Sequence, residues 1–369
     1  MSSTSYENFE QESLLVDVKE LESYIEIHKI GLNSLRGRIL FPIEESIAAM
    51  KIYFHETGFS PYFDKTNLVD SPHIIYLTRI NSNQTSIAKS SQHRSVVISA
   101  ALFIATVFTT LLVGSLNRGG NPFAHFTDIF WGIPFSFSLL LILGGHELGH
   151  YFTSRKYGVS VTLPYFLPIP HPLIGTMGAF IRIKSVIPNR RALVKIGVAG
   201  PVIGFILAIP ITIIGIALSK ITNVSTVSTS INLGSSLLFK FISYLIYPHI
   251  PAGYDLALHP MAFAGWLGFF VTALNLLPVG QLDGGHIAYA IFGKYRKIVT
   301  IIIIVMMAAL GLLWPGWFFW ILLIVLFGLR HPKAQDEITQ LTTSDKVWAM
   351  IALFVMILVF IPNPFPIKL

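Results

Sequence analysis

Long apolar runs dominate the sequence from residue 95 onward, and they constrain the fold more than any other feature. Seven such runs occur, at 95–115, 130–152, 193–218, 260–281, 297–314, 316–329 and 346–362. A transmembrane helix needs about 20 predominantly apolar residues to cross a bilayer core. Charged residues make up 12% of the chain, against about 25% in soluble globular proteins. We therefore predict a mainly α, polytopic membrane domain over residues 95–369, with about six to seven spans.

Residues 1–94 have a different composition, with 12 acidic and 9 basic side chains. Within them, 43–57 has the apolar pattern of a helix and 73–80 has that of a strand. The first 30 residues are polar and acidic, so we expect no signal peptide. The sequence predicts a small, soluble, acidic α+β domain ahead of the membrane domain.

The positions of lysine and arginine predict the orientation, because these residues concentrate in the cytosolic loops of membrane proteins. With residues 1–94 in the cytosol and each run crossing once, 13 basic residues fall in cytosolic loops and four on the opposite side. We therefore expect a multi-pass protein whose N-terminal domain is cytosolic. No basic cluster interleaves with aromatic residues, so nucleic-acid binding is not expected. The chain has no cysteine, which excludes disulfides and thiolate metal sites.

Two carboxylates lie within or at the ends of apolar runs, where an ion is costly unless it has a partner. The first, Glu147, belongs to an HExxH pattern, His146-Glu147-Leu148-Gly149-His150. On a helix, two histidines four residues apart lie on one face, so both imidazoles can bind one metal ion. Glu147 projects to the side, where a general base for a metal-bound water belongs. The alternative is a pair of core histidines held by neighbouring helices.

The second carboxylate, Asp283, follows a stretch rich in proline and glycine, Asn275-Leu276-Leu277-Pro278-Val279-Gly280-Gln281-Leu282-Asp283-Gly284-Gly285-His286. Pro278 and the glycines predict a helix break here, and such a break can turn Asp283 toward a metal held by another helix. Asp283 is thus a candidate third ligand, with the alternative that it caps the next helix. His286 is a rival ligand, and Asn275 is a candidate hydrogen-bond donor to a substrate backbone or an oxyanion.

These two motifs, in this order, resemble the site-2 protease family of intramembrane zinc metalloproteases, whose signature is HExxH followed by NxxPxxxxDG. The resemblance covers about residues 130–295. It implies one zinc ion per chain, bound by His146, His150 and Asp283, with Glu147 as general base or acid. It also implies a three-span catalytic core that opens toward the cytosol, and substrates that are single-pass or other transmembrane-helix proteins within the lipid bilayer.

The segment Gly175–Lys184 is similar to the strand that follows the HExxH helix in that family. From the residues alone, Phe180 to Val186 alternates apolar and basic side chains, as an edge strand does. A scissile peptide must be extended, and an edge strand offers it backbone partners. We therefore expect a short β-segment in which Gly178, Ala179, Phe180 and Ile181 bind substrate. The alternative is a structural hairpin that covers the site.

The sequence departs from the family in the middle core span, where the family often has GxxxN. Here Gly200-Pro201-Val202-Ile203-Gly204 ends in glycine, which favours close helix packing. The predicted function is intramembrane zinc proteolysis. Two alternatives stay open: an inactive membrane scaffold or chaperone that retains the metal site, and a metal transporter. The sequence predicts neither the natural substrate nor the oligomeric state.

Overall fold

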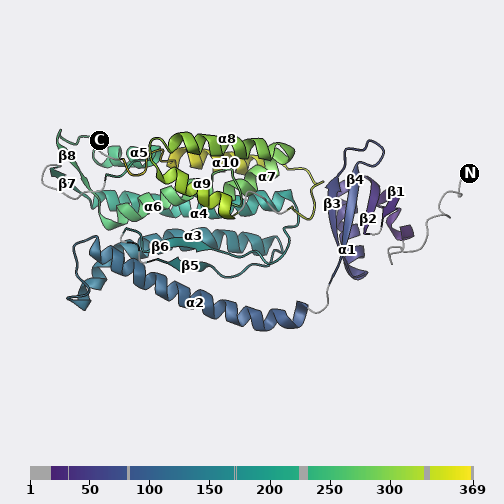
Figure 1. The fold of residues 1–369 in the computed structure, drawn as a ribbon, viewed down its shortest axis with the longest axis horizontal. Coiled ribbons are helices and arrows are strands. Elements are labelled where there is room, and N and C mark those ends of the chain that lie inside the picture. Colours follow the sequence, from purple (N-terminus) through teal and green to yellow (C-terminus); the bar gives the residue numbers. More distant parts are fainter. Residues whose placement is uncertain are drawn as a thin grey trace, which may run out of the picture. The chain divides into compact units, whose positions relative to one another are not determined.

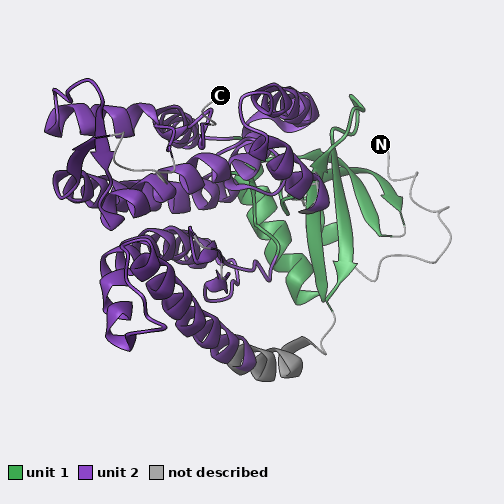
Figure 2. Cartoon of the chain, turned by 60° about the vertical axis from the view of Figure 1, so that its left-hand side comes forward, with its two compact units in different colours: residues 1–89, 186–190, 333–340 green, residues 90–185, 191–332, 341–369 purple. Residues whose placement is uncertain are grey.

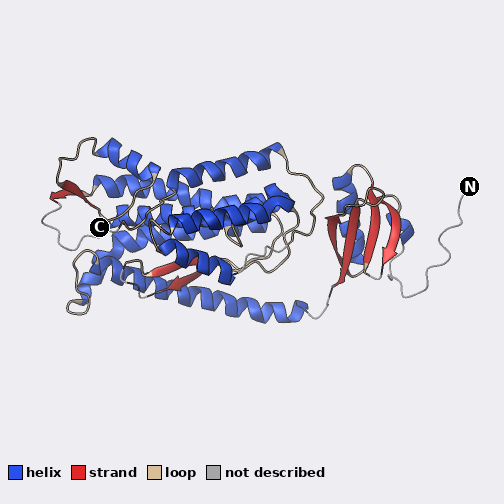
Figure 3. Ribbon diagram, turned by 45° about the horizontal axis from the view of Figure 1, so that its top comes forward, coloured by secondary structure: helices blue, strands red, loops and turns tan. Residues whose placement is uncertain are grey.

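The computed structural model describes residues 18–31, 33–80, 84–169, 171, 173–223, 232–327 and 333–366. Within this part the chain is mainly helical, as predicted, with small antiparallel sheets (Figure 3). It divides into two compact units (Figure 2). Unit 1 comprises residues 1–89, 186–190 and 333–340, and unit 2 comprises residues 90–185, 191–332 and 341–369. Unit 1 therefore contains two segments from far along the chain in addition to the N-terminal part.

Unit 1 is built on a four-stranded antiparallel sheet with the strand order β1-β2-β4-β3 (Figure 1). Its elements are the 3-10 helix η1 (Val18–Leu21), β1 (Ile25–Gly31), β2 (Ser34–Ile39), α1 (Ile43–Glu56), β3 (Phe59–Lys65) and β4 (His73–Arg79). The helix predicted at 43–57 and the strand predicted at 73–80 both occur, as α1 and β4. This unit is an α+β fold, as expected for the N-terminal region.

Helix α1 forms because its apolar residues recur three and four positions apart. Ile47, Met50 and Phe54 are buried on one face of the helix. They join a core with sheet residues such as Leu35 and Ile75, both fully buried. Burying side chains of this size stabilises the unit by about 1.5–3 kcal/mol each relative to exposure.

Residues 333–340 pair with the edge strand β3 and extend the sheet. Phe63 donates its backbone N–H to the carbonyl of Gln335 (2.8 Å) and accepts from the N–H of Glu337 (3.0 Å). These bonds form a parallel bridge between Phe63 and Asp336. Ile338 then enters the core of unit 1, where it is 3% exposed. We refer to residues 333–340 as the docked segment.

Unit 2 is a helical bundle. Its helices are α2 (Gln84–Leu116), α3 (Ile133–Lys156), α4 (Arg190–Ala217), α5 (Leu237–Ile246), α6 (Pro260–Asn275), α7 (Asp283–Phe292), α8 (Arg296–Leu310), α9 (Gly316–Phe327) and α10 (Thr343–Val359), with the 3-10 helices η2 (Phe126–Gly132) and η4 (Gly293–Tyr295). Helix α3 packs most closely on α6, and α6 also contacts α10. Helix α5 is short and apolar.

Three helical segments in the described part of the chain are long and apolar enough to cross a membrane: Arg94–Leu116, Phe126–Lys156 and Arg190–Ala217. The runs predicted to span at 260–281, 297–314, 316–329 and 346–362 contain shorter helices, with 16 residues in α6, 15 in α8, 12 in α9 and 17 in α10. Residues 328–329 of the third of these runs lie outside the described residues. The structure therefore does not confirm six to seven full spans. The helix in the run 260–281 already ends at Asn275, before the turn at Pro278, and the turn at Pro315 separates α8 from α9.

A short β-segment follows α3, as predicted, and it is one strand of a hairpin, whose strands lie earlier in the sequence than the alternation indicated. Strands β5 (Tyr165–Pro168) and β6 (Thr176–Phe180) pair antiparallel. The strand expected over 180–186 is therefore wrong, apart from an isolated bridge between Val161 and Ile183. The N–H of Arg182 donates to the hydroxyl oxygen of Thr162 (2.9 Å) rather than to a backbone carbonyl. The remaining backbone bonds here, from Thr162 to Arg182 and from Lys184 to Ser160, support only that isolated bridge. Strands β7 (Lys220–Asn223) and β8 (Tyr254–Ala257) form a second two-stranded antiparallel sheet, with α5 between them in the sequence.

Candidate metal centre

Helix α3 holds the two histidines of the HExxH pattern inside the bundle. His146 and His150 are one helical turn apart, and they are 4% and 6% exposed. Their Nε2 atoms are 3.1 Å apart. The helix spacing therefore brings two potential ligand atoms to one point, as the sequence predicts.

The third potential ligand comes from the break between α6 and α7. Helix α6 ends at Asn275 and α7 begins at Asp283, with a tight turn between them. This turn requires glycine, because a Cβ on Gly284 would lie 2.0 Å from the carbonyl oxygen of Leu276. Gly280, in the same turn, has a φ of +60°, a backbone conformation that glycine adopts more easily than other residues. Asp283 is therefore the first residue of α7, directly after this connection, and its side chain faces α3.

The three side chains form a compact cluster. The Oδ2 atom of Asp283 is 3.2 Å from Nε2 of His146 and 3.2 Å from Nε2 of His150. In tetrahedral zinc sites the bonds to nitrogen and oxygen are about 2.0–2.2 Å, which separates neighbouring ligand atoms by about 3.3–3.6 Å. The observed separations are close to that geometry. The donor set of two imidazoles and one carboxylate also leaves a fourth position for water, as in catalytic sites.

The orientation of His150 is set by α4. Its Nδ1 atom is 2.8 Å from the backbone carbonyl of Ile196. A carbonyl accepts only from an N–H, so this bond places the ring proton on Nδ1 and leaves the lone pair of Nε2 facing the cluster. Metal-binding histidines are commonly held in this way, because the second hydrogen bond fixes both the tautomer and the ring.

Three glycines of α4 form a stripe that lies against the cluster. A Cβ on Gly200 would be 2.1 Å from Nε2 of His150, and one on Gly204 would be 3.2 Å from Cβ of His146. A Cβ on Gly197 would be 3.1 Å from the backbone oxygen of Asp283. The close packing predicted for Gly200 and Gly204 is therefore packing against the candidate ligands themselves. Gly197 was not predicted as a site residue, although its position three residues before Gly200 and seven before Gly204 was the available signal.

Glu147 lies beside the cluster without belonging to it. Its side chain is buried, at 6% exposed, and its carboxyl is hydrogen-bonded by the backbone of Ile181, just after β6. The acid therefore connects the candidate metal centre to the hairpin. This is the relation expected for a general base near a metal-bound water.

Asn275 also lies at the cluster, with its side-chain nitrogen 3.3 Å from Nε2 of His146. Asn275 is the last residue of α6, so the helix break that positions Asp283 also positions this side-chain amide. His286 is one turn beyond Asp283 on α7, and it is absent from the group of three ligand atoms found among the described residues. The rival role of His286 as a ligand therefore has no support in the geometry.

The residues expected to bind substrate lie on and beside β6. Gly178, Ala179 and Phe180 belong to β6, and Ile181 follows it. The known partner of β6 in its sheet is β5, with Ala179 opposite Phe166 and Phe180 opposite Tyr165. Gly178 has a φ of +104°, which interrupts the regular strand geometry at its centre.

A buried cluster of two histidines and an aspartate, held between helices of an apolar bundle, defines an α-helical membrane protein with a metal centre of the HExxH type. The comparison with family models identifies it further. Residues 134–313 match the model of peptidase family M50, and the chain belongs to that family. The resemblance predicted from the two motifs is thereby confirmed.

Several plant proteins are similar to this chain. "Probable zinc metalloprotease EGY2, chloroplastic" of Arabidopsis thaliana is 32% identical over 239 residues, which cover 63% of this chain and 42% of that protein. "Probable zinc metalloprotease EGY1, chloroplastic" of the same plant is 33% identical over 299 residues, with 72% and 53% covered. The chain thus spans about half the length of the curated relatives it matches. No solved structure matches it.

Proposed function

We propose that this protein is an intramembrane zinc metalloprotease that hydrolyses peptide bonds within or near transmembrane helices of other proteins. The observation that carries the proposal is the 3.1–3.2 Å convergence of the His146, His150 and Asp283 ligand atoms. Membership of family M50 and the names of the relatives support the same activity. A bound zinc ion would supply Lewis-acid activation of water and of the scissile carbonyl.

In this proposal Glu147 moves the proton. Its carboxylate accepts a proton from the attacking water and then gives it to the leaving amine. Burial and the backbone bond to Ile181 hold the carboxylate beside the cluster. Asn275, at the same site, donates to the substrate backbone or to the developing oxyanion.

The substrate would bind along β6. A helix hides its carbonyls in its own hydrogen bonds, so the segment to be cut must unwind before it reacts. An exposed strand edge replaces those bonds by β-addition. The segment suited to this role is Gly178, Ala179, Phe180 and Ile181. Its last residue, Ile181, is hydrogen-bonded to Glu147 through its backbone. The pairing would place the extended substrate next to the general base.

We propose that the protein is a multi-pass membrane protein with its N-terminal domain and the opening of its site on the cytosolic side. The three helices that are long and apolar enough to span support the membrane location. The excess of basic residues in the predicted cytosolic loops supports the orientation. Its partners are then the lipid bilayer and transmembrane-helix substrates.

The test is cleavage of a model single-pass substrate in liposomes by the full chain and by two variants. Glu147→Gln should slow cleavage by at least about 10²-fold, because it removes the proton acceptor but no metal ligand. Asp255→Asn, a matched change of an exposed acid on β8, should cleave normally. Zinc content is measured on the same samples. Absence of cleavage by the unaltered chain would favour the scaffold or transporter, and loss of zinc in Glu147→Gln would contradict the assigned roles.

A further inference from the structure

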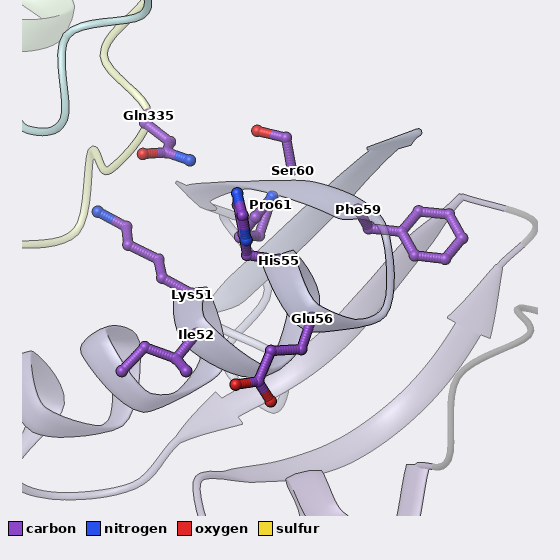
Figure 4. A pocket seen from close by; sticks show the side chains of 8 residues that line it. All are labelled: Lys51, Ile52, His55, Glu56, Phe59, Ser60, Pro61 and Gln335. Atoms are coloured by element: carbon purple, nitrogen blue, oxygen red, sulfur yellow. The ribbon is translucent and has the colours of Figure 1, made fainter. Parts of the chain in front are cut away.

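Unit 1 contains a pocket of about 390 Å³, formed by the second half of α1, the start of β3 and Gln335 of the docked segment (Figure 4). This volume is within the range of small-molecule sites, about 300–1,000 Å³. All of its lining residues belong to unit 1 and none belongs to the candidate metal centre. The proposed protease activity therefore leaves this pocket without a role.

Hydrogen-bond donors converge on the pocket. Figure 4 shows the side chains of Lys51, His55, Ser60 and Gln335 around one space, while the carboxylate of Glu56 points away from it. Together they offer an ammonium, an imidazole, a hydroxyl and an amide. This set of donors suits an oxyanion, because each can donate to a phosphate or carboxylate oxygen.

The charge of Lys51 is only partly compensated by the protein. Its Nζ atom donates to the carbonyl of Pro188 at 3.3 Å and lies 5.8 Å from the centre of the Phe63 ring. The nearby carboxylate of Asp336 is already bonded within its own turn, accepting from the N–H groups of Ile338 and Thr339. Burial lowers the pKa of Lys51, and attraction to Asp336 opposes this only in part. An additional negative charge in the pocket would stabilise the ammonium.

We propose that this pocket binds a small molecule carrying a phosphate or carboxylate group, with Lys51, His55, Ser60 and Gln335 as donors. The ligand would contact both the N-terminal domain and the docked segment, because Gln335 belongs to the latter. It would therefore bind only while the segment is paired with β3. By mass action, a ligand at 100 times its Kd makes opening of that pairing about 100-fold rarer.

Hydrogen–deuterium exchange on the full chain in detergent micelles tests the proposal, with inorganic phosphate as the probe. Sodium chloride at the same ionic strength is the reference. The N–H of Gln335 donates to Ile187 (2.9 Å) and that of Glu337 to Phe63 (3.0 Å), so both report opening of the docked segment. Phosphate should slow their exchange saturably. A parallel series with citrate distinguishes a carboxylate ligand from a phosphate ligand. Protection by either anion supports the proposal, and the anion that protects at the lower concentration identifies the preferred group.

Two lysine variants provide the matched comparison. Lys51→Met retains most of the side-chain length and should weaken phosphate protection at least 10-fold, whereas Lys65→Met, at an exposed lysine of β3, should leave it unchanged. His55→Gln, at an exposed position of α1, tests the site without altering the core and should weaken protection at least 3-fold. The proposal is overturned if neither phosphate nor citrate protects the unaltered chain. It is also overturned if His55→Gln and Lys65→Met behave alike.

Discussion

At the scale of single residues, the glycine stripe of α4 decides how closely this helix approaches the candidate ligands. Gly200 has no room for a Cβ, which would meet the ring of His150 at 2.1 Å. Gly204 has slightly more room, because a Cβ there would meet its nearest neighbour, Cβ of His146, at 3.2 Å. Because interiors are packed as densely as organic crystals, a single added methyl group here must displace an imidazole or the helix.

Gly200→Ala should therefore reduce the zinc content of the purified protein at least 10-fold and abolish cleavage. Gly204→Ala should cause a smaller loss, because its contacts are about 1 Å longer. Gly144→Ala on α3 is the control, since its Cβ would meet only the ring of Phe166 at 3.7 Å and alanine favours helix by about 1 kcal/mol. Zinc measured by mass spectrometry checks all three. Full zinc content in Gly200→Ala would contradict the role assigned to the stripe.

At the scale of elements, charged residues tie the first turn of α10 to α4. Asp345 is 2% exposed and accepts from the N–H and the hydroxyl of Thr342, completing a capping box. Its carboxylate is also 3.5 Å from Nζ of Lys195 and 3.9 Å from Nε of Arg191, both on α4. Lys195 precedes Ile196, whose carbonyl holds His150. The ion pairs therefore support the element that orients a candidate ligand.

Asp345→Asn should lower stability by about 1–3 kcal/mol, because it leaves two cations facing a neutral amide. Thr342→Ala removes the cap hydroxyl but keeps the carboxylate, and should cost about 1 kcal/mol. Thermal unfolding of the full chain in detergent measures both. An equal loss in the two variants would show that Asp345 acts only as a cap.

The docked segment shows what sequence patterns do and do not predict. Helix α1, strand β4 and the HExxH helix follow from local periodicity, and all three were predicted. The pairing of Phe63 with Gln335 joins residues more than 250 positions apart and has no periodic signal. Asp283 was predicted because the breaks around it were visible, whereas Gly197 carries no chemistry of its own and was missed. Contacts set by tertiary packing are not encoded in any local window.

Ile338→Ala should destabilise unit 1 by about 2–4 kcal/mol, since it opens a cavity in the core that α1 and the sheet share. Ile52→Ala, at a position of α1 that is 62% exposed, should change stability little. Limited proteolysis of the full chain compares the two. The role of the docked segment in the core of unit 1 would be disproved by equal protease resistance.

At the scale of the whole molecule, orientation in the membrane connects the proposed site to its substrates. The chain has no cysteine, so a single cysteine introduced at one place reports its own exposure to an impermeant maleimide. Glu26→Cys in β1 should be labelled in cells only after the membrane is permeabilised. Asn117→Cys, just after α2, should be labelled in intact cells. The reverse pattern would invert the proposed topology.

The central claim is that one zinc ion is bound by His146, His150 and Asp283. Metal analysis of the purified full chain tests this most directly, with Asp283→Ala measured alongside. We predict about one zinc per chain in the unaltered protein and a large loss in Asp283→Ala, because two imidazoles alone leave the site one protein ligand short. Equal zinc content in the two proteins, or none in the unaltered one, would contradict the account.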